Sequence, residues 1–503
     1  MLCTTIRELL TEAEGKYSRN DAIRYKIAKD TIEAKTYSDL KRDSESFSCV
    51  LQALGEQGGH IALTGATSYS WIAAYFGIVN SGSVAVPLDV SLPAEEVCEL
   101  VNRSDATVFL VDEIRGDVLA MAKESCPKLK YLISMQKEES DELTLSMKQL
   151  MREHAGSCDF APQPDQLATI MFTSGTTGKS KGVMLTHRNL AENATCLDMK
   201  FEEGCVLLSV LPIHHAYCLS MDILKGLHTG AVVCINDSLI RMVKNIKLFR
   251  PNMILMVPLM IETIAKKLED VSGLPPKLVK WQVFGKQFHT ICSGGAYLSP
   301  DMLDLFEKYG ITILQGYGMT ECSPVISTTV SWNIRKGSVG QLMPNCEAKT
   351  VDEELWVRGS SVMQGYYQMP EETTEALTED GWLRTGDLGY VDADGFVYLT
   401  GRKKNLIITK NGENVSPEEL ENKLGEQRLV QEVLVRESEG VIEAEIFPDY
   451  EYVKKKKIGD VQSALQEMID TYNQGAPAYK KIYRLKVRDT EFPKTPSKKI
   501  KRY

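Results

Sequence analysis

The sequence predicts an α/β protein, with a large N-terminal domain of layered α and β segments that ends in a β-rich section, and a small α+β C-terminal domain. Three observations predict this fold. Short apolar strands alternate with helical patterns up to about residue 260, hairpin-like strands follow residue 335, and charged mixed α/β sequence follows Gly401. Strands that alternate with helices form parallel sheets covered on both faces. We therefore expect domains of residues 1–403 and 404–503.

The first alternating series begins with a helix. Apolar residues recur at helical spacing between Thr36 and Leu54, and Gly55 follows as a stop signal that ends the helix. Strands and helices then alternate. The expected helices are Thr36–Leu54, Tyr69–Asn80 and Ala94–Asn102, and the expected strands are His60–Leu63, Val84–Leu88 and Thr107–Val111.

A second series has the same rhythm. Its expected strands are Val206–Leu211, Val232–Ile235 and Met253–Val257, and its expected helices are Cys218–His228 and Ile240–Phe249. In the β-rich section we expect a strand at Glu354–Arg358 and a hairpin at Gly389–Thr400 that turns at residues 392–395. The lysine run 454–457 is expected to be a solvated loop, with an anionic partner as the alternative.

Charge is unevenly distributed along the chain. The 503 residues include 58 basic and 68 acidic side chains, a net charge of −10, which argues against a general nucleic-acid binder. Residues 480–503 contain ten basic and two acidic residues, a net charge of +8, so the preceding 479 residues carry −18. The basic tail therefore needs an explanation.

The twelve cysteines are irregularly spaced, without CxxC pairs or zinc-finger spacing. We expect them to be small buried hydrophobic residues with reduced thiols. The N-terminus lacks the apolar core of a signal peptide, and no run of about 18 apolar residues occurs. These features predict a cytoplasmic protein without a transmembrane segment.

A loop rich in Gly, Ser and Thr follows the apolar strand Ile170–Phe172. Its glycines let backbone amides face an anion, its hydroxyls add donors, and Lys181 adds positive charge. The Gly-Lys-Ser at 178–180 imitates the end of a Walker A loop, but Thr173 stands where that motif requires its first glycine. We therefore predict a polyphosphate-binding loop of another class, with a plain Gly/Ser turn as the alternative.

This loop, TSGTTGKSKGV, resembles the signature of adenylate-forming enzymes, the superfamily of acyl-CoA synthetases, luciferases and adenylation domains, with Ser180 where members usually have proline. Eight further segments match family motifs in the family's order. They are TYSDL (36–40), GIVNSGSVAVPLD (77–89), LPIHHAYCLS (211–220), SGGAYLS (293–299), QGYGMTE (315–321), WLRTGDLGYVDADGFVYLTGR (382–402), KNGENVSPEELE (410–421) and FPKTPSKKIKRY (492–503).

The resemblance implies a nucleotide site for ATP and Mg²⁺. In this site Tyr317 would stack on the adenine and Leu399 would line the adenine pocket. Asp387 and Arg402 would bind the ribose. Glu321 would hold Mg²⁺, and its hard oxygens suit that ion. The other implied nucleotide-binding residues are Thr173, Ser174, Gly175, Thr176, Thr177, Gly178, Lys181, Gly294, Gly295, Ala296, Gly318 and Met319. Structural roles are the alternatives: a core tyrosine at 317, a surface or capping glutamate at 321 and a turn aspartate at 387.

The resemblance also implies catalytic roles. Thr320 would donate to the α-phosphate, and His215 would position the substrate carboxylate, with a buried core histidine as the alternative. The lysine-dense end of the chain would supply a cation to the developing charge. The register of Pro493 and Ile500 favours Lys499 for this role, with Lys498 as the alternative because it replaces a family glycine.

The implied reaction has two halves. A carboxylate attacks the α-phosphate of MgATP to give an acyl-adenylate and pyrophosphate, and a thiol then displaces AMP. In the family the small C-terminal domain moves between the two halves, and this would make Lys404 the hinge and Gly412 part of the thiol path.

The substrate is less closely specified. The segment around His215 is mostly apolar or aromatic, and Met256–Ile261 resembles the medium- to long-chain fatty acyl-CoA synthetase branch, so a fatty acid is the leading expectation and an aryl acid the next. Coenzyme A is the expected thiol and an acyl carrier protein the main rival. A non-catalytic acyl-AMP or nucleotide binding protein is the remote alternative.

Overall fold

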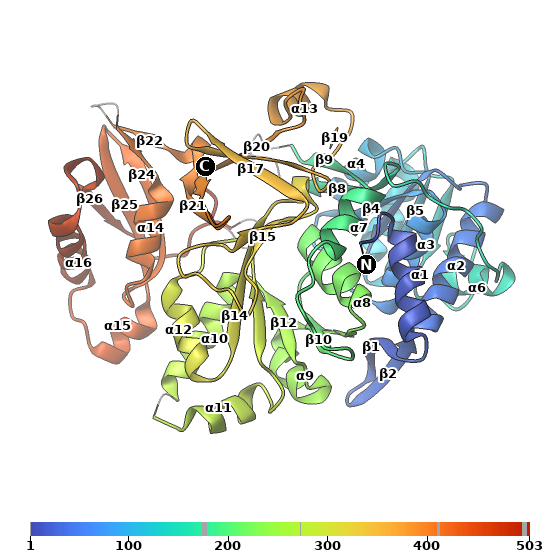
Figure 1. The fold of residues 1–503 in the computed structure, drawn as a ribbon, viewed down its shortest axis with the longest axis horizontal. Coiled ribbons are helices and arrows are strands. Elements are labelled where there is room, and N and C mark those ends of the chain that lie inside the picture. The colour runs from blue at the N-terminus through green and yellow to red at the C-terminus, as the bar shows by residue number, and fades with distance from the viewer. Residues whose placement is uncertain (1, 174–178, 272, 410–412, 495–499, 503) are drawn as a thin grey trace. The chain divides into compact units, whose positions relative to one another are not determined.

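The computed structural model describes residues 2–173, 179–271, 273–409, 413–494 and 500–502 (Figure 1). The chain forms two compact units, which are described separately. The first unit comprises Met1–Ala348, Val357–Arg384 and Asp394–Phe396, and the second comprises Lys349–Trp356, Thr385–Ala393 and Val397–Tyr503. The boundary proposed near Lys404 stays a prediction.

The first unit contains an eight-stranded sheet whose interior strands are short and apolar. Parallel pairs join β8, β4, β3, β5, β6 and β7, whereas β9 and β19 add antiparallel strands at one edge. The strands, in sheet order, are β19 (Gly365–Tyr366), β9 (Lys181–Thr186), β8 (Leu167–Thr173), β4 (Val84–Leu88), β3 (His60–Thr64), β5 (Val108–Val111), β6 (Tyr131–Ser134) and β7 (Leu145–Ser146).

Helices associated with this sheet begin at polar caps. Thr36 starts α2 with a capping box, in which its hydroxyl accepts a hydrogen bond from the Asp39 amide and the Asp39 carboxylate accepts one from the Thr36 amide. Val97 of α4 and Val118 of α5 pack with Val86 and other strand residues in one buried cluster. The helices are α1 (Ile6–Tyr17), α2 (Tyr37–Ala53), α3 (Tyr69–Asn80), α4 (Ala94–Arg103), η1 (Glu113–Arg115), α5 (Gly116–Ser125), α6 (Met147–Glu153) and α7 (His187–Thr195).

A nine-stranded sheet forms the other half of the first unit. Its centre is parallel, and β2, β15 and β16 pair antiparallel with their neighbours. The strands, in sheet order, are β16 (Gln341–Leu342), β15 (Val325–Thr328), β14 (Thr312–Gly318), β13 (Thr290–Ser293), β12 (Met253–Met256), β10 (Val206–Ser209), β11 (Val232–Ile235), β1 (Asp21–Ala28) and β2 (Thr31–Thr36).

Helices α9 to α12 share a buried cluster with the central strands of this sheet (Figure 1). Ile246, Val279 and Phe306 contribute from three of these helices, and Ile254 and Ile291 contribute from strands. The helical segments are η2 (Cys218–Lys225), α8 (Gly226–His228), η3 (Leu239–Arg241), α9 (Met242–Phe249), α10 (Pro258–Asp270), α11 (Pro276–Val283), α12 (Pro300–Lys308), η4 (Thr320–Cys322) and α13 (Pro370–Ala376).

A four-stranded sheet has the order β17 (Cys346–Val351), β18 (Glu354–Gly359), β20 (Leu383–Val391) and β21 (Val397–Arg402). The rest of the second unit is a small α+β structure in which α14 and α16 pack on strands β24 and β25 around Leu420, Ile446 and Leu465. Its elements are η5 (Lys403–Asn405), β22 (Ile407–Ile408), β23 (Asn414–Val415), α14 (Pro417–Gly425), β24 (Val430–Ser438), β25 (Val441–Pro448), α15 (Tyr450–Lys456), α16 (Val461–Gly475), η6 (Ala478–Lys480) and β26 (Arg484–Val487).

Most expected elements agree with the structure to within one or two residues, and α3 has the predicted bounds. The loop expected at lysines 454–457 is wrong. Three of these lysines form the last turn of α15, which Asp449 caps by accepting a hydrogen bond from the Tyr452 amide, and Lys457 ends the helix in a left-handed conformation. Cations are favourable at a helix C-terminus. All twelve cysteines are free, and most are buried as expected.

Within the described parts of the chain, no helix combines the length and the apolar character that crossing a bilayer requires.

Candidate active site

Three predicted site segments lie at one edge of the nine-stranded sheet. β10, β12, β13 and β14 are neighbouring parallel strands, so their carboxyl ends share an edge. His215 follows β10, Gly294 follows β13, and Tyr317 lies at the end of β14. Ligands of open α/β sheets bind at such edges. The sheet order therefore gathers segments that are up to about 100 residues apart in the sequence.

Two glycines allow close approach at this edge. A Cβ atom on Gly294 would lie 3.1 Å from Cζ of Tyr217, so the tyrosine ring packs directly on the predicted adenine turn. A Cβ on Gly318 would lie 1.9 Å from the carbonyl oxygen of Pro324, which is far inside van der Waals contact. Gly318 is therefore required by the chain's own backbone, in addition to the predicted approach of adenine.

The phosphate side of the site comes from three elements of the first unit. Thr173 of β8 pairs with Lys181 of β9, and the predicted residues between them, Ser174, Gly175, Thr176, Thr177 and Gly178, lie outside the described residues. The Lys181 ammonium lies 4.8 Å from the ring centre of Tyr366. The Tyr366 hydroxyl in turn donates a hydrogen bond of 2.9 Å to Oε1 of Glu321.

The structure thus brings together the loop lysine and the predicted magnesium ligand through a tyrosine. Burial first, and then the nearby Glu321 charge, raise the pKa of Tyr366, so the phenol stays protonated and acts as the donor. Glu321 lies in η4 beside Thr320 and is partly exposed, with Met319 preceding the turn.

The chemistry of this donor set fits magnesium. Mg²⁺ usually keeps several waters and takes one or two carboxylates together with substrate phosphates. Glu321 supplies one oriented carboxylate, and Lys181 provides a cation for the phosphates on the same side. The described residues contain no cluster of three or more His, Cys, Asp or Glu side chains suited to a metal, so the fit depends on Glu321 and a phosphate substrate together.

The predicted acid-positioning histidine is exposed and lies against its neighbour. The rings of His214 and His215 are 4.3 Å apart, and Nε2 of His214 lies 3.6 Å from Oδ2 of Asp89. Burial raises the pKa of Asp89, but the His214 imidazole and two donors of Ser91 outweigh it and hold the pKa below its ordinary value. Asp89 follows β4 of the other sheet, so this pair links the two sheets of the first unit.

A π-helix, η2, follows the histidines, and such turns are frequent at functional sites. Its Asp222 is completely buried; Oδ2 accepts a hydrogen bond of 2.8 Å from Ser209, and Oδ1 has no hydrogen-bond partner among the described residues. Burial raises the pKa of Asp222 to about 7, against the lowering effect of Ser209 and Cys218. Cys218 is completely buried beside this carboxylate.

The two predicted ribose contacts are partners in the second unit. Asp387 and Arg402 face each other across the β20–β21 hairpin, and Nε of Arg402 lies 2.7 Å from Oδ1 of Asp387. The aspartate is buried and the arginine is half-exposed. Leu399 lies on the same strand and is partly exposed. This arrangement fixes the direction of the carboxylate while the arginine side chain stays half-exposed.

The flanks of the predicted catalytic lysine are anchored within the second unit, although Lys499, Lys498 and Gly412 lie outside the described residues. Lys494 and Ile500 pair as an antiparallel bridge. Phe492 packs in a small apolar cluster, against which Ile500 also lies. Arg502 forms ion pairs with Glu418 and Glu421 of α14.

The basic tail is largely neutralised by its own unit. Six of its ten basic residues form ion pairs with acids of the second unit. They are Lys480 with Glu419, Arg484 with Glu439 and Glu443, Lys486 and Arg488 with Glu445, Lys494 with Glu432 and Glu491, and Arg502 with Glu418 and Glu421. The charge asymmetry of the sequence is therefore mainly a structural feature of this unit.

Sequence reasoning missed Tyr366 and Asp89. Tyr366 lies 45 residues from Glu321 in the chain, and its only local signal is the Gly-Tyr-Tyr run at 365–367. Asp89 is the last residue of GIVNSGSVAVPLD (77–89), a segment that resembles a family motif but carries no predicted site residue. Its signal was a carboxylate at the carboxyl end of a parallel strand, where functional groups of α/β proteins gather.

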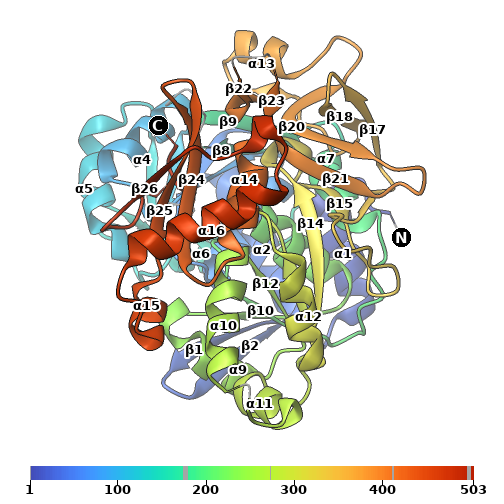
Figure 2. The same ribbon diagram turned by 90° about the vertical axis from the view of Figure 1, so that its left-hand side faces the viewer.

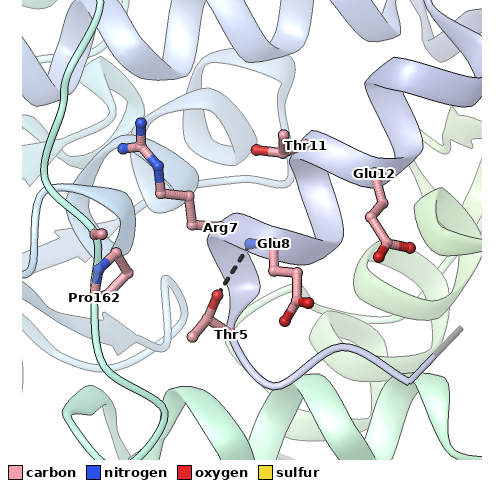
Figure 3. Close-up of a pocket in the computed structure, with 7 residues that line it drawn as sticks. Thr5, Arg7, Glu8, Thr11, Glu12 and Pro162 are labelled. Carbon is pink, nitrogen blue, oxygen red and sulfur yellow. Dashed lines mark hydrogen bonds between the residues drawn. The ribbon is translucent and has the colours of Figure 1, made fainter.

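A separate hollow of about 260 Å³ lies beside α1 (Figure 3). Its lining is Thr5, Arg7, Glu8, Thr11, Glu12, Ala161 and Pro162, and none of these is a predicted site residue. Thr5 caps α1 by accepting a hydrogen bond of 3.0 Å from the Glu8 amide, and Arg7 donates to the carbonyls of Asn80 and Cys158. These side chains serve the packing of α1.

Comparison with known proteins gives consistent matches. A model of the AMP-binding enzyme family matches residues 10–367, and a model of the AMP-binding enzyme C-terminal domain matches residues 404–503. The chain is 28% identical over 443 residues to the long-chain-fatty-acid–CoA ligase FadD15 of Mycobacterium bovis, which covers 76% of this chain and 72% of the relative. It is 28% identical over 512 residues to the chloroplastic long-chain-fatty-acid–[acyl-carrier-protein] ligase AEE15 of Arabidopsis thaliana, with coverage of 80% and 70%.

Among solved structures, the anthranilate CoA ligase AuaEII in complex with anthranoyl-AMP matches 99% of this chain and 95% of its own, with a TM-score of 0.85 and 21% identity. That likeness extends over a large N-terminal and a small C-terminal domain and concerns the fold.

Proposed function

The chain belongs to the AMP-binding enzyme family and is an acid–thiol ligase of its adenylating class, and we propose that its acid is a fatty acid and its thiol is coenzyme A. The observation that carries the proposal is the contact of Lys181 and Glu321 with one tyrosine, Tyr366. A cation and a magnesium-binding carboxylate on one side of a site are what the activation of a carboxylate by MgATP requires.

In the first half-reaction, an oxygen of the substrate carboxylate attacks the α-phosphorus of ATP, and the bond to pyrophosphate breaks. Lys181 neutralises phosphate charge, Thr320 donates to the α-phosphate, and His215 orients the acid. Glu321 holds Mg²⁺, which when bound offsets further phosphate charge. Lys499 supplies a cation to the attacking oxygen and the α-phosphate. These groups stabilise charge that accumulates in the transition state.

In the second half-reaction, the thiol sulfur attacks the acyl carbonyl carbon, and AMP leaves with the electrons of the broken bond. Lys499 must first withdraw, and we propose that residues 404–503 turn at Lys404 and that Gly412 then lines the thiol path. A cytoplasmic location is part of the same proposal.

Two features support a fatty acid. The segment Met256–Ile261 at the end of β12 is apolar, and Tyr217, whose ring packs against Gly294 after β13, is an aromatic residue of the segment around His215. The similarity to FadD15 supports both a long-chain acid and coenzyme A. The similarity to AEE15 favours an acyl carrier protein as the second candidate thiol.

ATP–pyrophosphate exchange with a panel of straight-chain, aryl and amino acids tests the first half-reaction. We expect exchange with straight-chain acids, and Glu321→Gln should abolish it. ATP binding without exchange for any acid would identify a non-catalytic nucleotide binder and reject the proposal, and exchange confined to aryl acids would reject the fatty acid.

Thioester formation with coenzyme A and with acyl carrier protein, measured side by side, tests the identity of the thiol.

ATP–pyrophosphate exchange also tests which lysine is catalytic. Lys499→Ala should lose this exchange and Lys498→Ala should retain it. The reverse pattern would transfer the catalytic role to Lys498.

A further inference from the structure

Two adjacent helical segments of the first unit expose large apolar side chains. Ile240 in η3 is 97% exposed and Trp281 in α11 is 62% exposed. We call this surface the basic apolar face; its exposed apolar residues are Leu239, Ile240, Val243, Leu274, Leu278 and Trp281. Helices α9 and α11 are in contact, and Figures 1 and 2 both show them at the same lower end of the first unit.

These side chains do not belong to the core of the protein. The inner sides of the same helices already pack in the buried cluster through Ile246, Phe249 and Val279. Leu278 and Trp281 are three residues apart in α11 and therefore lie on one side of that helix, whereas Ile240 and Val243 flank the junction between η3 and α9. Single exposed apolar residues are common, but five on two contacting segments, with Leu274 just before α11, mark an interaction surface.

The same segments are strongly basic. Residues 239–250 and 275–288 contain seven basic residues and no acid, whereas the whole chain carries −10. The seven are Arg241, Lys244, Lys247, Arg250, Lys277, Lys280 and Lys286. Arg241 is paired with Asp237, and Lys280 donates to the Gly310 carbonyl, whereas Lys244 and Lys247 are exposed beside Val243.

We propose that the basic apolar face docks the protein on the surface of an anionic lipid bilayer. Isoleucine and tryptophan enter the boundary between headgroups and acyl chains, and lysine and arginine reach the anionic headgroups. Such a surface satisfies both features of the face. An acidic protein would need an apolar patch matched to Ile240 and Trp281 as well as acidic groups, whereas a bilayer needs no matched shape, and a second copy would oppose seven cations with seven more. The inference depends only on exposure and charge, so it stands apart from the proposed choice of acid and thiol.

Co-sedimentation of the full chain with phosphatidylcholine vesicles, with and without phosphatidylglycerol, tests the proposal. We expect binding only to the anionic vesicles, and its loss at high salt. The double variant Ile240→Ser, Trp281→Ser should weaken binding to anionic vesicles at least about tenfold. A second double variant, Lys244→Glu, Lys247→Glu, should weaken it as much, because both apolar insertion and charge contribute.

Two matched controls keep the test specific. Ile114→Ser removes another apolar side chain that is highly exposed in the first unit, and Lys454→Glu, Lys455→Glu reverses two charges in the lysine run of α15. Both should retain binding to within about twofold, since neither lies on the basic apolar face. Thermal unfolding shows that each variant is folded.

Three results would overturn the proposal: no binding of the wild type to anionic vesicles, equal losses in the controls, or unchanged binding by both face variants. Sedimentation velocity without lipid adds a fourth. A dimer that Ile240→Ser, Trp281→Ser dissociates would make the face an interface between two copies.

Discussion

The hydroxyl of Tyr366 donates a hydrogen bond of 2.9 Å to the carboxylate of Glu321, and the same ring lies 4.8 Å from the Lys181 ammonium. One aromatic residue of β19 therefore holds two groups of the proposed phosphate site. Partners that orient a metal-binding carboxylate influence metal affinity as well as geometry.

Tyr366→Phe removes the hydroxyl and keeps the ring beside Lys181. Because Glu321 loses the donor that orients it, we expect the Mg²⁺ concentration for half-maximal ATP–pyrophosphate exchange to rise about tenfold. A titration of exchange against Mg²⁺ measures this. Glu321→Gln, which removes the charge itself, should show no exchange at any Mg²⁺ concentration. An unchanged magnesium dependence in Tyr366→Phe would show that the hydroxyl does not orient the carboxylate.

The pair of Asp89 and His214 is expected to stabilise the contact between the two sheets of the first unit. Both side chains are largely buried and 3.6 Å apart. A double-mutant cycle with Asp89→Asn and His214→Gln should give a coupling energy of about 1 kcal/mol in urea denaturation. Asparagine retains an acceptor for Ser91, so the cycle isolates the partner across the sheets. Additive single effects would mean that the pair contributes nothing.

Asp222 is expected to make stability depend on pH near neutrality. Its pKa in the folded protein is about 7 because of burial, whereas an unfolded aspartate has a pKa near 3.9. The folded state holds a proton that the unfolded state releases, so this contribution is present at low pH and is lost as pH rises through about 7.

Relative to Asp222→Asn, the wild type should therefore lose about 1 kcal/mol of unfolding free energy between pH about 6 and about 8. Urea denaturation of both proteins at each pH measures the difference. Other groups that titrate in this range, such as Glu421, are common to both proteins and cancel. Parallel pH curves would mean that Asp222 does not carry a raised pKa.

The element order was predictable because it depends on local signals. Ser68 accepts a hydrogen bond from the Trp71 amide and fixes the start of α3, which has the predicted bounds. The cross-strand pair Asp387 and Arg402 is only partly local. The hairpin that turns at residues 392–395 brings the two strands together, but a register shift between Leu388 and Gly389 sets Arg402 opposite Asp387.

The long-range partners were not predictable from the pattern. Tyr366 meets Glu321 only because β19 joins the edge of the eight-stranded sheet beside β9. The basic tail is another example. Its charge suggested an anionic ligand, but Arg488 pairs with Glu445 on β25, 43 residues away. Local sequence shows that a charge exists, whereas the topology decides which partner it meets.

Arg502 is expected to anchor the C-terminal strand segment through Glu421 of α14. The pKa of Glu421 is raised to about 7, because burial raises it by more than the Arg502 charge lowers it. Without the arginine this pKa would rise further. Arg502→Ala should therefore destabilise the second unit by about 2 kcal/mol at pH about 8, where Glu421 is ionised, and by less at pH about 5.5, where it is protonated.

Hydrogen exchange of peptides from α14 and β24 in the full chain measures this opening free energy. Lys423→Ala is the matched control, because its pair with Glu419 on the same helix is exposed and should contribute at most about 0.5 kcal/mol. Glu421→Gln mimics the protonated carboxyl, so in that background the effect of Arg502→Ala should lose its pH dependence. If Arg502→Ala and Lys423→Ala had equal effects, Arg502 would be one more surface cation, and the segment after Lys499 would depend on the apolar packing of Ile500 alone.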